Sequence, residues 1–151
     1  MSTINIAPEE KRRSERQDWL FQAEERPRRP YALLHLSSHG LLLQVDARLA
    51  FLAGAWASVI VICQAAIEAT LRDLQLHDYE TKAKGIFFDQ EDLEQMRSLR
   101  NELLHPQAPG TPSQVWCLPG GDVAGCHAAL EAHAKNAYEL MLEATYANRE
   151  A

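Results

Sequence analysis

The sequence predicts an all-α protein, an antiparallel bundle of four to five helices. Three observations lead to this prediction. Apolar residues recur at helical spacing over several long stretches, and no alternating apolar and polar run bounded by turns indicates a sheet. The 151 residues contain 46% hydrophobic and 24% charged residues, which is typical of one soluble globular domain. The segment 114–118 is the one strand candidate, and a weak one.

We divide the chain into a charged N-terminal arm or docking helix, residues 1–30, and a helical domain, residues 31–151. The arm contains seven of the fifteen Lys and Arg residues, with acids between them. Residues 8–25 suit a helix whose small apolar face consists of three residues: Trp19, Leu20 and Ala23. Prolines then end it. The segment is a solvated tail, a docking helix, or an arm in which Arg28 and Arg29 contact phosphate.

Three long helices are predicted in the second part. The first spans about 46–76, the second begins near Asp89 and stops before Pro106, and the third spans about 123–147. The segment 106–122 is rich in Pro and Gly and therefore predicts a loop. The apolar stripe of the first helix recurs at helical spacing: Leu49, Leu52, Trp56, Val59, Ile60, Cys63, Ile67, Leu71 and Leu74.

One stretch suggests a membrane-associated protein as an alternative. Residues 49–67 carry no formal charge over nineteen positions, which reaches the length of a membrane span. However, the run is rich in Ala and includes Gly54, Ser58 and Gln64, and its helical pattern continues past Glu68. A helix that is apolar on most sides is also typical of the centre of a bundle, so we expect no membrane association.

Net charge and cysteine content limit the possible partners and the cellular compartment of the protein. The net charge of -6 excludes a global basic field, so any affinity for nucleic acid must come from a local site. Three cysteines, an odd number, do not indicate a disulfide framework, and the polar N-terminus lacks the apolar core of a secretory signal. We expect a cytoplasmic protein.

One segment contains residue types that suit catalysis, Leu99-Arg-Asn-Glu-Leu-Leu-His-Pro106. Arg100 falls within the apolar face of its helix, where a guanidinium is costly unless it is paired. His105 follows in the last turn. A histidine transfers protons near neutral pH, and an arginine binds a phosphate and stabilises a pentavalent oxyphosphorane. Asn101 could orient either group. RNA supplies its own nucleophile, the 2′-hydroxyl, so such a site needs no cofactor and no metal.

The same residues admit a structural interpretation. Arg100 could pair with a buried acid for stability alone, and His105 could simply end the helix. A single helix also provides only one histidine, which leaves the second proton-transfer role empty. A two-fold homodimer that apposed two such helices would fill it.

The segment Arg100-Asn-Glu-Leu-Leu-His105 resembles the signature of HEPN domains (higher eukaryotes and prokaryotes nucleotide-binding), an Arg followed after four to six residues by a His. The helix 62–72, rich in small residues with an embedded acid, and the helix 123–147 agree with this family. The resemblance covers roughly residues 40–148. It implies a helical bundle that dimerises with its two motifs facing each other.

In many members the family implies metal-independent RNA cleavage by a toxin or an antiviral-defence effector. Carried over to this chain, Arg100 and His105 are catalytic, Asn101 supports them and Glu68 orients Arg100, although Glu68 could also be an ordinary surface residue. Members that are paired with a nucleotidyltransferase antitoxin often have Tyr two residues after the His, where this chain has Gln107. Silencing of this chain by modification at that position is therefore in doubt.

Other interpretations remain. A catalytically inactive HEPN-like domain could bind a nucleotide, RNA or a partner protein, and an antitoxin could be one such partner. Cys117, Cys126 and His127 lack the spacing of a zinc site. His133 is expected in the core or an interface. The pair His35 and His39 is expected at the surface.

Overall fold

The computed structural model describes residues 9–26, 32–34, 38–76, 90–105, 108, 110 and 122–148. Five helices lie within these ranges: α1 (Glu9–Glu25), α2 (Ser38–Leu52), α3 (Trp56–Leu76), α5 (Gln90–Leu104) and α6 (Val123–Thr145). The predicted all-α class is confirmed for this part of the chain, with one small addition. Two three-residue strands, β1 (Ala32–Leu34) and β2 (Tyr146–Asn148), pair antiparallel, with Leu33 opposite Ala147.

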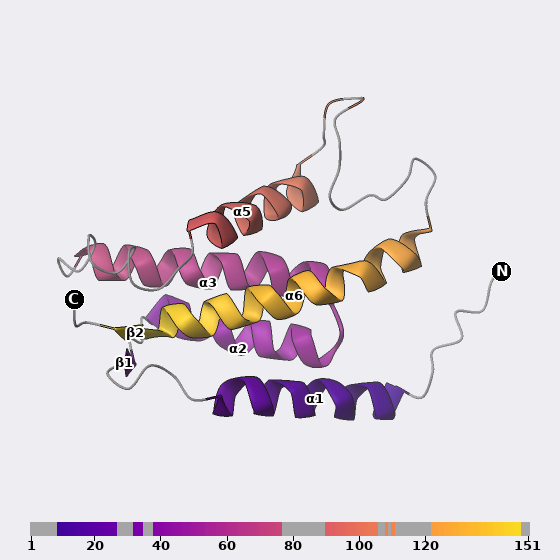
Figure 1. The fold of residues 1–151 in the computed structure, drawn as a ribbon, viewed down its shortest axis with the longest axis horizontal. Coiled ribbons are helices and arrows are strands. Elements are labelled where there is room, and N and C mark those ends of the chain that lie inside the picture. The colour runs from indigo at the N-terminus through magenta and orange to yellow at the C-terminus, as the bar shows by residue number, and fades with distance from the viewer. Residues whose placement is uncertain are drawn as a thin grey trace.

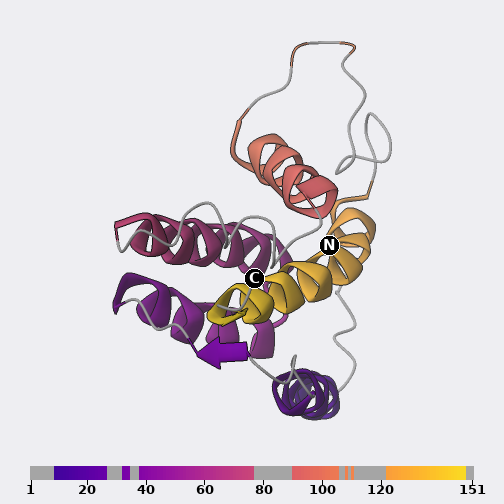
Figure 2. The same ribbon diagram turned by 60° about the vertical axis from the view of Figure 1, so that its left-hand side comes forward.

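The helices pack around α3. Figure 1 and Figure 2 show α1 and α5 on opposite sides of a central group formed by α2, α3 and α6. α3 packs along both α2 and α6, whereas α5 contacts α3. The buried side chains of α3 follow the predicted stripe at helical spacing: Trp56, Val59, Ile60, Cys63, Ile67 and Leu71. None of the helices in the described residues is long and apolar enough to cross a membrane.

An aromatic cluster joins four helices. Phe51 of α2 stacks on Trp19 of α1 with ring centroids 4.8 Å apart. Its ring also meets Trp56 of α3 at 5.2 Å and Tyr138 of α6 at 5.5 Å, both edge to face. Aromatic contacts of this kind add to the stabilisation that burial provides. The cluster therefore fixes α1 to the rest of the molecule.

The prediction of one helix over 46–76 is wrong, because the chain turns between α2 and α3. Gly54 adopts a positive φ of 70°, a conformation that favours glycine. The amide of Gly54 donates to the carbonyl of Phe51, and that of Ala55 donates to Ala50, both at 2.9 Å. This pair of bonds is the Schellman motif that ends helices at a glycine.

A buried arginine of α1 completes this turn. The guanidinium of Arg16 donates from Nε to the carbonyl oxygen of Leu52 at 2.8 Å and also pairs with Glu9. Its side chain is 10% exposed. The carbonyl at the end of α2 thus has a charged donor, which satisfies a group that the end of a helix leaves unpaired.

The N-terminal segment contains a packed helix in its described part. Leu20 and Ala23 of α1 are buried, and Glu24 accepts hydrogen bonds from Arg48 of α2 and from the hydroxyl of Tyr138 of α6. A solvated tail does not describe residues 9–26. Arg28 and Arg29, which we considered for phosphate contacts, lie outside the described residues, as does the strand candidate 114–118.

Candidate functional site

The helix that carries the motif is amphipathic. Leu93, Met96 and Leu99 are buried and face the core. Glu91 and Asp92 in the first turn are favourable near the positive end of the helix dipole. The helix ends at Leu104, where the amide of His105 donates to the carbonyl of Asn101 at 2.9 Å, directly before Pro106. These local features agree with the predicted helix.

Arg100 lies at the edge of the contact between α5 and α3. Its Nη1 donates to Oε1 of Glu68 on α3 at 2.9 Å, and its Nη2 donates to Oδ1 of Asn101 at 3.2 Å. The side chain of Arg100 is 24% exposed and that of Glu68 is 39% exposed. The expected partnership of Arg100 with Glu68 and Asn101 is therefore present in the geometry. A half-buried pair of this kind orients the guanidinium more than it stabilises the fold.

Two further residues contact the same carboxylate. Gln64, one turn earlier on α3, is fully buried and donates from Nε2 to Oε1 of Glu68 at 3.1 Å. Arg97, one turn before Arg100 on α5, places its Nε 4.0 Å from that oxygen. Neither contact was predicted from the sequence. Gln64 had a signal, because it is a polar residue within the apolar stripe of α3.

Two buried polar atoms in this network have no hydrogen-bond partner: Nε of Arg100 and Oε1 of Gln64. A buried donor or acceptor without a partner lowers the stability of the fold. One is a donor and the other an acceptor, and both belong to side chains that are bonded to Glu68. The contact between α3 and α5 thus contains one hydrogen-bond donor and one acceptor that the fold leaves unpaired.

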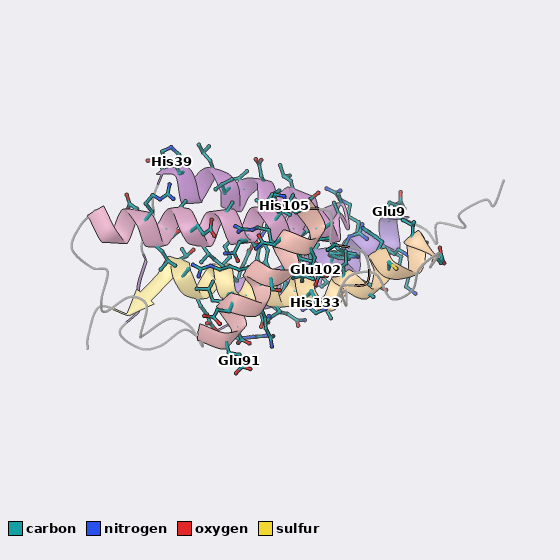
Figure 3. The ribbon with its side chains drawn as sticks, turned by 90° about the horizontal axis from the view of Figure 1, so that it is seen from above. Glu9, His39, Glu91, Glu102, His105 and His133 are labelled. Carbon is teal, nitrogen blue, oxygen red and sulfur yellow. The ribbon has the colours of Figure 1, made fainter. Side chains whose placement is uncertain are left out.

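His105 lies at the C-terminal end of α5 and is exposed. Figure 3 shows α5 crossing α3 obliquely, with His105 on the side of α2 and Glu91 on the side of α6. Within the described part of the chain, no side chain bonds to its imidazole. The ring is thus accessible to a substrate or to a second subunit.

The remaining candidates are dispersed. His133 on α6 is exposed, so it does not lie in the core; its other expected place, an interface, stays a prediction. His39 at the start of α2 is exposed as expected. Cys126 is buried whereas the adjacent His127 is exposed. Among the described residues, no group of three or more His, Cys, Asp or Glu side chains is placed to hold a metal ion. His35, Gln107 and Cys117 lie outside those residues.

Comparison of the chain with models of protein families, with curated proteins and with solved structures gives no match. The candidate site therefore consists of the residues themselves: an arginine oriented by a carboxylate and an amide, and an exposed histidine five residues later at the end of the same helix.

Proposed function

We propose that this protein is a HEPN-type, metal-independent endoribonuclease that acts as a homodimer, as a toxin or an antiviral-defence effector. The observation that carries the proposal is the pairing of Arg100 with Glu68 at 2.9 Å and with Asn101 at 3.2 Å. A planar guanidinium that two partners hold in one orientation is suited to positioning a phosphate. The exposed His105 lies on the same helix.

The roles follow from the chemistry of the groups. His105 of one subunit accepts the proton of the 2′-hydroxyl as its oxygen attacks phosphorus. The bond from phosphorus to the 5′-oxygen breaks, and the imidazole of the second subunit donates a proton to that oxygen. Arg100 stabilises the charge on the pentavalent phosphorus. The products are a 2′,3′-cyclic phosphate and a 5′-hydroxyl. Asn101 and Glu68 hold Arg100 in place.

The test is RNA cleavage in EDTA by the parent and by two variants. We expect His105→Ala to lower the rate at least 100-fold and Arg100→Ala to lower it about 100- to 1000-fold. His133→Ala and Arg12→Ala are matched controls, because both residues are exposed on other helices. Their rates should equal that of the parent. Cleavage that EDTA abolishes, or variants as active as the parent, would contradict the proposal.

Expression in cells provides a second test of the proposed setting. If the protein is a toxin, its expression should arrest growth, and His105→Ala should relieve the arrest. If growth is unaffected, the proposed toxin role is wrong, even where the purified protein cleaves RNA.

Two observations favour a second candidate function, a catalytically inactive HEPN-like domain that binds a nucleotide, RNA or a partner protein. Both terminal nitrogens of Arg100 already donate to side chains of the same subunit, and the net charge of the chain is -6. Under this alternative, RNA stays intact in the cleavage assay while a ligand still binds. Cleavage that leaves a 2′,3′-cyclic phosphate and a 5′-hydroxyl supports the nuclease, whereas intact RNA with a bound ligand supports the inactive domain.

A further inference from the structure

Arg97 of α5 faces Glu68 alongside Arg100 but has no role in the proposed reaction. Its Nε lies 4.0 Å from Oε1 of Glu68, whereas Nη1 of Arg100 lies 2.9 Å from the same oxygen. The side chain of Arg97 is 45% exposed, compared with 24% for Arg100. An exposed and weakly paired guanidinium loses little when it turns to another anion, so Arg97 is available to a ligand.

The charges around Glu68 leave a positive excess. Two guanidinium groups share this one carboxylate, and Gln64, which also bonds to it, is neutral. The acids of the first two turns of α5 precede both arginines: Glu91, Asp92 and Glu94. Glu102 lies about 140° around the helix from Arg97. In a chain with a net charge of -6, attraction for a polyanion requires a local excess of this kind.

Arg97 shares an exposed face of α5 with two residues of the proposed site. Asn101 follows it by one turn and His105 by two turns, at about 40° and about 80° around the helix axis. All three residues are exposed. Along the axis, Arg97 lies about 12 Å from His105 but only about 4.5 Å from Arg100. An anion bound at Arg97 therefore lies next to one bound at Arg100, on the side away from the histidine.

We infer that Arg97 binds the phosphate next to the scissile one, so that the preferred substrate is an RNA strand with at least two consecutive phosphates. The inference rests on the proposed function, which places the scissile phosphate at Arg100 and His105. The planar guanidinium of Arg97 suits this contact because its paired donors match two phosphate oxygens. Arg97 thus contributes to the affinity for a strand, whereas Arg100 and His105 act on the bond that breaks.

The test compares the cleavage of two substrates in EDTA, a dinucleotide with one phosphodiester and an RNA octanucleotide. Arg97→Ala should raise the KM for the octanucleotide about 10-fold and change kcat by less than about 2-fold, because a charge-assisted contact to phosphate is lost. The dinucleotide has no second phosphate, so its KM should rise several-fold less. If Arg97 acts only by orienting Glu68, kcat falls equally on both substrates, and the inference is overturned.

Two further variants control this measurement. Arg12→Ala removes the same charge from an exposed arginine of α1 and should keep the KM of the parent on both substrates. Arg97→Lys keeps the charge without the planar fork and should recover part of the affinity for the octanucleotide. Thermal unfolding checks that every variant is folded. An Arg12→Ala variant with the same rise in KM as Arg97→Ala would reduce the effect to net charge and overturn the inference.

Direct binding of a fluorescent octanucleotide, measured in the His105→Ala background, separates the inference from the proposed function. Loss of one phosphate contact in Arg97→Ala should reduce the slope of log affinity against log salt by about 0.7. If the parent cleaves RNA but Arg97→Ala keeps its KM and the salt slope, the inference is overturned and the function stands. If RNA binds but the parent leaves it intact, the nuclease is contradicted, and a reduced slope still supports the contact. Absence of RNA binding and cleavage overturns both.

Discussion

The two arginines that are most informative in this structure have opposite surroundings. Arg16, at the corner between α1 and α2, has a side chain 10% exposed and donates to a helix-end carbonyl and to Glu9. Arg100, between α3 and α5, is 24% exposed, is held by side chains of Glu68 and Asn101, and leaves its Nε buried without a partner. Arg16 bonds to a backbone carbonyl as well as to a side chain, whereas the bonds of Arg100 go to polar side chains.

This difference distinguishes a region with a structural role from the proposed site. At the corner the polar groups close a turn that the fold requires, and Phe51, the residue before Leu52, stacks on Trp19. At the contact between α3 and α5, Gln64 is fully buried with an unpaired oxygen, although an apolar side chain would fit the stripe of α3 without that cost. Polar groups that lower stability are expected at sites that serve another purpose.

The largest effect on stability is expected for Arg16→Ala. It removes a charged hydrogen bond to the carbonyl of Leu52 and leaves that carbonyl without its donor. We expect the free energy of unfolding to fall by about 2–4 kcal/mol, measured by denaturant titration. Arg12→Ala, an exposed arginine of the same helix, should change it by less than about 0.5 kcal/mol. Equal effects would mean that Arg16 does not close the turn.

A smaller loss is expected for Gly54→Ala. Gly54 has a φ of 70°, and a Cβ there would lie 3.2 Å from Nη1 of Arg16, so both the backbone and the guanidinium oppose it. The free energy of unfolding should fall by about 1–2 kcal/mol. Gly125→Ala, in the first turn of α6, meets only ordinary contacts at 3.7 Å and should stabilise the protein by up to about 1 kcal/mol. Chemical denaturation of both variants measures the contrast.

Alkaline pH should lower the free energy of unfolding through two buried groups, Cys63 and Tyr138. Burial raises the pKa of the Cys63 thiol above its ordinary value of 9.0. Burial, with the nearby charge of Glu24, raises the pKa of the Tyr138 hydroxyl above 10.0. The unfolded chain releases these protons first as the pH rises, so the free energy of unfolding falls from about pH 9 upward.

Tyr138→Phe tests this pH dependence. It removes the hydrogen bond of 3.0 Å from the hydroxyl to Glu24, which should cost about 1 kcal/mol at neutral pH. It should also make the decline above pH 10 shallower than in the parent, because one of the two titrating groups is absent. Parallel pH profiles of unfolding would show that Tyr138 does not contribute to the decline.

The smallest effect on stability is expected for Gln64→Met. The replacement has a similar shape and removes a buried oxygen that has no partner, so the free energy of unfolding should stay within about 1 kcal/mol of the parent or rise. The cleavage rate should nevertheless fall several-fold, because Glu68 loses the donor at 3.1 Å that helps to orient it toward Arg100. An unchanged cleavage rate would limit Gln64 to a structural role.

The site helix could be predicted from the sequence because its signals are local. The stripe of Leu93, Met96 and Leu99 and the stop at Pro106 define α5, and the family resemblance indicated that Glu68 would meet Arg100. The break at Gly54 was missed, although a glycine is a local signal for the end of a helix, because the apolar stripe continues past it. The contact of Arg16 with the carbonyl of Leu52, 36 positions later, could not be predicted.

The other features that the sequence did not predict also depend on distant contacts. The strands β1 and β2 are three residues each, too short for an alternating pattern, and they pair across most of the chain. The role of Gln64 follows from where its amide points, which helical spacing alone does not specify.

The most direct test of the account measures two quantities on two variants, Arg100→Ala and Arg16→Ala. For each, the rate of RNA cleavage in EDTA is compared with the free energy of unfolding. We predict that Arg100→Ala loses at least 100-fold in cleavage but no more than about 1 kcal/mol of stability, whereas Arg16→Ala loses stability and keeps the cleavage rate of its folded fraction. The account is contradicted if Arg100→Ala behaves like Arg16→Ala, losing stability while RNA cleavage is unchanged.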